Sequence, residues 1–129
     1  MKVTEQQVLA RMRKICLALA GTEEKISHGH PTFATGKGIY AVLEEYRGEL
    51  SICVKVGLEV QGVFLEDPRY YLTPYSGKHG WVSLKVHAAP LDWKEIVGLL
   101  AGSHHLTSTA AKKPKPPRAP QARRRSSPL

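Results

Sequence analysis

The sequence predicts an α+β fold, a two-layer sandwich whose antiparallel sheet is covered on one face by an N-terminal and a C-terminal helix. Helix-capping signals stand near both ends of the domain, and between them apolar and polar residues alternate at strand spacing. Apolar residues become scarce after residue 107. We therefore divide the chain into a domain over residues 1–107 and a disordered basic tail over residues 108–129.

The first helix is predicted by its capping residues and by the spacing of its apolar residues. Thr4 is a suitable N-cap, and Gln7 three residues later completes a capping box. Apolar residues then recur at helical spacing and form one stripe that can be buried; these are Val8, Met12, Ile15, Cys16 and Leu19. Gly21 is expected to end the helix.

The last helix carries the same signals. Asp92 is the expected cap, with Glu95 three residues later. Gly98 weakens the helix by about 1 kcal/mol relative to alanine. We expect a glycine at this position because another backbone approaches closely there. Gly102 is the expected end of the helix.

Strand signals fill the middle of the chain. Two apolar runs, 38–46 and 49–55, flank Arg47-Gly48 and predict a hairpin. Further along we expect a short helix over 58–65, a strand from residue 70, a loop over 73–80 and a strand over 81–87.

Charge is divided unequally along the chain. Of its 19 Lys and Arg residues, seven lie after residue 111 without an acidic residue among them, which leaves 12 against 11 acids in the domain. A partner that is a polyanion is therefore expected at the tail, where prolines also oppose folding. The expected phosphate contacts of the tail include Lys112, Lys113, Arg123, Arg124 and Arg125. The alternative is a solubilising extension that has no dedicated partner.

Several short runs together resemble the MmcQ/YjbR family over roughly residues 3–107. They are Gly21, Glu24, His28-Gly29-His30-Pro31-Thr32-Phe33, Asp67-Pro68-Arg69-Tyr70, Gly80-Trp81-Val82 and Leu91-Asp92-Trp93. The resemblance implies a CyaY-like fold. It also implies DNA binding through two protruding loops, the "double wing". The long Lys/Arg/Pro tail departs from the family pattern.

Candidate nucleic-acid contacts within the domain follow from strand alternation and from the two loops. If the helices cover the apolar face, Trp81 and Lys85 point to the other face, where an indole beside a lysine could stack on a base. The wings would be the Arg47 turn and the loop that carries Tyr75, Lys78 and His79. Two alternatives stay open. In one, Trp81 packs under the Tyr75 loop; in the other, its sheet face binds a protein or a small ligand as an adaptor.

Other classes of function find little support in the sequence. It contains no phosphate-cradling glycine loop and no nucleophile elbow, and Cys16 and Cys53 sit among apolar neighbours, so we expect a non-catalytic protein. Six histidines lack the partners of a zinc site, and His28 and His30, which would share a strand face, are expected to shape a turn. We expect no cofactor, no metal, no membrane span and a cytoplasmic location, with DNA bound non-specifically and any protein partner unidentified.

Overall fold

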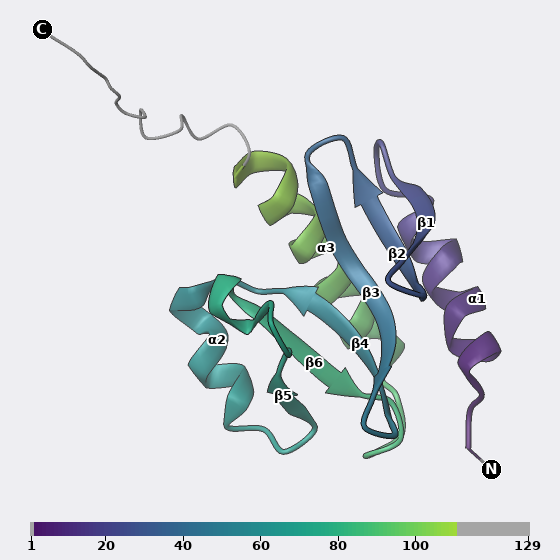
Figure 1. Cartoon of the computed structure of the whole chain (residues 1–129), viewed down its shortest axis with the longest axis vertical. Coiled ribbons are helices and arrows are strands. Elements are labelled where there is room, and N and C mark those ends of the chain that lie inside the picture. The colour runs from purple at the N-terminus through teal and green to yellow at the C-terminus, as the bar shows by residue number, and fades with distance from the viewer. Residues whose placement is uncertain (1, 111–129) are drawn as a thin grey trace, which may run out of the picture.

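The computed structural model describes residues 2–110 and has the predicted α+β architecture (Figure 1). The elements follow the order α1 (Glu5–Cys16), β1 (Glu23–Ser27), β2 (His30–Thr35), β3 (Gly38–Tyr46), β4 (Glu49–Lys55), α2 (Leu58–Leu65), β5 (Tyr70–Leu72), a 3₁₀ turn (Gly77–His79), β6 (Trp81–Lys85) and α3 (Trp93–Ala110). The strands form one antiparallel sheet in the order β1-β2-β3-β4-β6-β5. The predicted two-layer fold is thereby confirmed.

Helices α1 and α3 lie on the same face of the sheet, with α3 crossing behind β3 and β4 (Figure 1). The core forms between these helices and the apolar side of the strands. Met12 of α1 and Ile96 and Leu100 of α3 are fully buried against strand residues such as Leu43 and Ile52. Among residues 2–110, no α-helix covers the opposite face of the sheet, and this face holds the candidate site.

Strand β3 contains a β-bulge that changes which residues face the helices. Phe33 of β2 pairs with Ala41, whereas the next residue, Ala34, pairs with Ile39, so Tyr40 is an extra residue in β3. Tyr40 and Ala41 are both fully buried. The Tyr40 hydroxyl donates to the carbonyl of Cys16 at 3.3 Å and lies 2.7 Å from the Thr22 hydroxyl. The bulge therefore connects the sheet to the segment that follows α1.

A serine from α3 fills the gap that the bulge leaves between β3 and β4. The regular pairing ends at Ala41 with Val54, and the next pair would be Tyr40 with Lys55. The Ser103 hydroxyl donates to the Tyr40 carbonyl at 2.6 Å and accepts from the Lys55 amide at 2.9 Å. It thus satisfies one backbone acceptor and one donor that the strands leave unpaired.

An arginine joins β5 to the start of α3. The Arg69 guanidinium donates to the carboxylates of Asp67 and Glu95 at 2.7–3.1 Å, and the Tyr70 hydroxyl donates to Glu95 at 2.7 Å. Hydrogen bonds from Arg69 lower the pKa of both carboxyl groups. Asp92 caps α3 as predicted, with its carboxylate accepting from the amides at positions 94 and 95.

Several predicted boundaries are wrong. Helix α1 ends at Cys16 rather than at Gly21, and β6 ends at Lys85 rather than at residue 87. Helix α3 runs through Gly102 and past residue 107 to Ala110. Its later turns stay helical because Ser103 and Thr107 are buried in the domain. Apart from the helix's own backbone, no atom lies within 4 Å of the position that a Cβ atom would take at Gly98. The expected close approach of another backbone therefore does not exist. Among residues 2–110, no helix is long and apolar enough to cross a membrane.

Candidate functional site: a groove on the helix-free face

The helix-free face of the sheet holds a groove made of two adjoining hollows. One, of about 230 Å³, reaches Trp81 and Cys53, and the other, of about 490 Å³, reaches Tyr46 and Tyr75. The two hollows share His28, His30, Glu44, Pro74 and Ser76. We call this combined space the groove.

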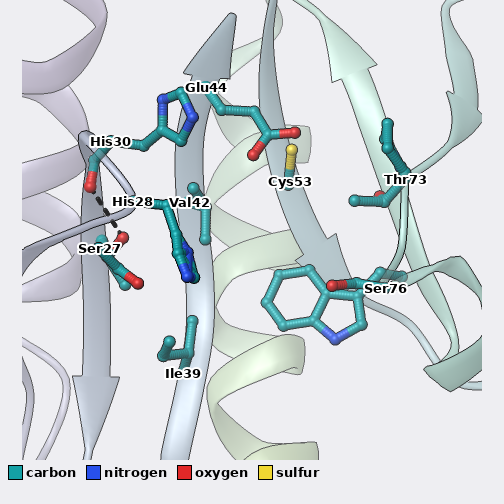
Figure 2. A pocket seen from close by; sticks show the side chains of 12 residues that line it. Ser27, His28, His30, Ile39, Val42, Glu44, Cys53, Thr73 and Ser76 are labelled. Carbon is teal, nitrogen blue, oxygen red and sulfur yellow. Dashed lines mark hydrogen bonds between the residues drawn. The ribbon is translucent and has the colours of Figure 1, made fainter. Parts of the chain in front are cut away.

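Opposite walls of the groove come from segments far apart in the sequence. His28 belongs to the turn between β1 and β2, whereas Thr73 and Ser76 belong to the connection between β5 and the 3₁₀ turn. Figure 2 shows the side chains of His28 and His30 on one side and those of Thr73 and Ser76 on the other. Glu44 extends from β3 between these walls, toward Cys53. Side chains from both ends of the sheet thus surround one space.

The β3 bulge decides which side chains form the floor. Before the bulge Ile39 lies on the groove face, and after it Val42 and Glu44 do, with Tyr40 turned into the core. Strict alternation from Ile39 would instead place Ala41 and Leu43 in the groove, and both of these are fully buried. The bulge is therefore what brings the carboxylate of Glu44 into the groove.

Next to the groove, hydroxyl and thiol groups bond to one another. Ser83 lies 3.2 Å from the Cys53 thiol and 2.9 Å from the Thr73 hydroxyl, and Ser51 lies 2.9 Å from the Tyr71 hydroxyl. Burial raises the pKa of Cys53 to about 12 and also raises the pKa of Tyr71. Because its members have partners, this network has the character of a buried polar layer that holds β4, β5 and β6 in place.

Two residues in the groove walls have a left-handed backbone although they are not glycine. His28 has φ 53° and Tyr75 has φ 66°. Such conformations cost of order 1–3 kcal/mol each and cluster at functional sites. For His28 the turn explains the conformation: Ser27 pairs with His30, and the two-residue turn between them has positive φ at both positions. For Tyr75 a tight turn explains it, because the Ser76 amide donates to the Pro74 carbonyl at 2.6 Å across this residue, which is 91% exposed.

The structure brings together only part of the predicted nucleic-acid site. Tyr75 lies in the groove wall, and Arg47, in the predicted hairpin turn, is exposed with its guanidinium 5.2 Å from the centroid of the neighbouring Tyr46 ring. Lys78 and His79 are exposed on the 3₁₀ turn but do not line the groove. Lys85 pairs with Ser51 at the far end of β6, about 13 Å along the strand from Trp81.

The expected exposure of Trp81 is wrong. Its side of β6 carries no helix, yet Trp81 is only 9% exposed and its neighbour Ser83 is fully buried, because the β5–β6 connection folds back over this face. The alternative, in which Trp81 packs under the Tyr75 loop, describes the structure better. The predicted tail contacts Lys112, Lys113, Arg123, Arg124 and Arg125 lie outside the described residues.

The histidines have separate roles. The predicted shared strand face does not exist, because His28 lies in a turn while His30 begins β2, but both line the groove. His104 of α3 instead lies 2.7 Å from the Ala20 carbonyl and packs edge-on against Tyr40. Within residues 2–110, no three histidine, cysteine or acidic side chains are placed to hold a metal ion.

Sequence reasoning missed the groove itself. It did not predict strands β1 and β2, it expected His28 and His30 to shape a turn, and it gave Glu44 no role. The hairpin signal could have been found, because His28-Gly29 separates two strands by two residues, as Arg47-Gly48 does. The bulge at Tyr40 carries no such signal.

Fold and groove together define an α+β domain with one helix-covered and one hollowed sheet face. The family model for YjbR matches residues 17–106, and the chain belongs to the YjbR family. A search of the curated proteins found no match.

Two crystal structures share the fold. A protein from Pseudomonas syringae is 21% identical, with a TM-score of 0.65 over 81% of this chain and 99% of its own. A Deinococcus radiodurans protein described as a DUF419 domain is also 21% identical, with a TM-score of 0.68 over 82% of each chain.

Proposed function

We propose that this protein is a non-catalytic DNA-binding protein whose affinity comes mainly from phosphate contacts made by residues 112–125. The observation that carries the proposal is the division of charge: seven Lys and Arg residues follow residue 111 without an acid, while the domain holds 12 basic and 11 acidic residues. Such a segment binds phosphates without regard to sequence and loses affinity as salt rises.

The domain adds a smaller contribution in this proposal. Arg47, Lys78 and His79 are exposed on the two loops that the family resemblance names as wings. The groove between them is a poor phosphate site, because Glu44 lines it. Phosphate contacts from the domain therefore come from the outer sides of the loops.

Fluorescence anisotropy of a labelled DNA duplex at a series of salt concentrations tests the proposal. The key variant keeps the full chain and changes the seven basic residues of the tail to glutamine: Lys112, Lys113, Lys115, Arg118, Arg123, Arg124 and Arg125. If all seven contacted phosphates, log K would fall with log salt at a slope of about −6. We expect the variant to lose most of that slope and at least about 100-fold in affinity at low salt.

Two further variants complete the design. Arg47→Gln with Lys78→Gln removes the wing cations and is expected to weaken binding by less than tenfold. Lys14→Gln with Lys94→Gln removes the same charge from exposed positions on α1 and α3, and is expected to change little. Unchanged affinity and slope in the tail variant would show that residues 112–125 are only a solubilising extension.

Trp81→Ala is not a useful test of binding. Because the indole is 91% buried, its removal leaves a cavity and destabilises the domain, which would lower any binding for reasons unrelated to contact. The adaptor alternative requires an open sheet face around Trp81. The burial of Trp81 argues against it.

A further inference from the structure

The groove has a charge opposite to that of the tail. Glu44 projects into it from β3, and no lysine or arginine among residues 2–110 lines it. Its carboxylate has no hydrogen bond or ion pair with another described residue. Glu45, the next residue, pairs with the core residue Leu50 and therefore projects to the other face of the sheet. A ligand that offers positive charge and N–H donors would meet one carboxylate whose two oxygens are both available.

Aromatic rings stand beside this carboxylate. Tyr46 and Tyr75 line the same hollow as Glu44, from the end of β3 and from the loop opposite. A cation is attracted to the face of such a ring. Tyr46 already shows this in the molecule, because the Arg47 guanidinium lies 5.2 Å from its centroid.

The exposure of Tyr75 is not explained by packing. The residue is 91% exposed, so it buries little apolar surface. Its left-handed backbone, with φ 66°, belongs to a tight turn in which the Ser76 amide donates to the Pro74 carbonyl at 2.6 Å. This turn holds the ring at the groove, where a ligand can reach it.

We propose that the groove binds a guanidinium group, with the two oxygens of the Glu44 carboxylate accepting its N–H groups and Tyr46 and Tyr75 flanking its plane. A planar guanidinium suits this arrangement better than a compact ammonium, because it can bond a carboxylate at two points while it stacks on a ring. The hollow of about 490 Å³ admits an arginine side chain with part of its backbone. This site is separate from the phosphate contacts of the proposed function and does not depend on them.

Isothermal titration calorimetry with two tripeptides tests the proposal. The first probe is acetyl-Gly-Arg-Gly-amide, and the second carries citrulline, which has nearly the same shape without the charge. Each is titrated into the full chain and into the full chain with the seven tail cations changed to glutamine. The second protein is needed because arginines of the tail offer the same chemistry and could compete for the groove.

We expect the arginine tripeptide to bind at least one of these two proteins at least tenfold more tightly than the citrulline tripeptide does. Binding that appears only after the tail is neutralised would show that the tail supplies a competing guanidinium. No binding to either protein, or equal binding of the two tripeptides, would overturn the proposal.

A carboxylate variant locates the site. Glu44→Gln keeps the shape of the side chain, which is only partly buried, so the fold should tolerate it. Loss of a charged hydrogen-bond partner is expected to weaken arginine binding by about 10- to 100-fold. The matched control, Glu59→Gln on α2, removes the same charge outside the groove and should bind as the unmodified chain does. Equal affinity in the two variants would also refute the site.

The result is distinguishable from a failure of DNA binding. Glu44→Gln removes a negative charge from the space between the two loops, so DNA affinity should stay the same or rise. A loss of DNA affinity in this variant would mean that the groove serves DNA, and would overturn the separation of the two sites.

Discussion

Replacing Ser103 with alanine removes the hydroxyl that joins β3 to β4 at the bulge. The substitution leaves the Tyr40 carbonyl and the Lys55 amide without the partner that the α3 side chain supplies. The carbonyl bond is buried and the amide bond is partly buried, and the hydroxyl itself belongs to a residue only 1% exposed. The loss in the free energy of unfolding should therefore come from two backbone groups that have no hydrogen-bond partner and that water reaches poorly.

The size of the effect can be estimated from these two groups. A buried donor or acceptor that loses its partner costs about 1–3 kcal/mol, with the partly accessible amide at the lower end. Alanine favours a helix over serine by about 0.5 kcal/mol, which offsets part of the loss. We expect a net loss of about 1.5–3.5 kcal/mol in the free energy of unfolding.

Urea unfolding, followed by circular dichroism, measures this loss. Ser108→Ala is the matched control, because Ser108 lies on the same helix and its side chain makes no hydrogen bond with another described residue. It gains the same helix propensity without losing a bond, so it should be neutral or slightly stabilising. A Ser103→Ala stability within about 0.5 kcal/mol of this control would refute the role of the hydroxyl at the bulge.

Three further predictions concern the rest of the fold. Gly80→Ala should destabilise the domain by more than about 2 kcal/mol in urea unfolding, because φ is +91° and a side chain would meet backbone atoms at 2.9–3.0 Å. Gly62→Ala, on α2 with open space around it, should instead stabilise by about 0.5–1 kcal/mol; equal effects would contradict the reasoning. The lowered pKa of Glu95 means that its arginine bond stabilises the fold above the ordinary carboxyl range and is lost as pH falls through the folded-state value. The stability gap between the unmodified chain and Glu95→Gln should therefore shrink from pH 7 to pH 3, and a gap that does not change with pH would refute this. Burial raises the pKa of Cys16 to about 11 and of Cys53 to about 12, so neither should react with iodoacetamide at pH 8 until the protein is unfolded, as mass spectrometry would show.

Local signals in the sequence predicted most of the fold. The capping box at Thr4, the turn at Arg47-Gly48 and the alternation in β4 each depend on neighbouring residues, and each is present in the structure. The helix ends were harder, because the burial of Ser103 and Thr107 keeps α3 helical beyond two glycines that would otherwise weaken it. Tertiary packing outweighed propensity there.

The candidate site was less predictable, because it depends on long-range arrangement. The bulge at Tyr40 is fixed by contacts with Cys16, Thr22 and Ser103, which lie 18 to 63 residues away in the chain. Without it, alternation alone gives no reason to place Glu44 opposite His28. Trp81 was assigned to the correct face, but the fold-back of the β5–β6 connection that covers it leaves no periodic signal.

A single NMR titration of the full chain tests the separation of the two proposed binding sites most directly. A DNA duplex is added first and the arginine tripeptide second, while backbone amide and tyrosine ring signals are followed. We predict that DNA shifts signals after residue 111, and that the tripeptide then shifts Glu44, Tyr46 and Tyr75 without releasing the DNA. Signals of Tyr46 and Tyr75 that respond to DNA while those after residue 111 stay in place would contradict both assignments.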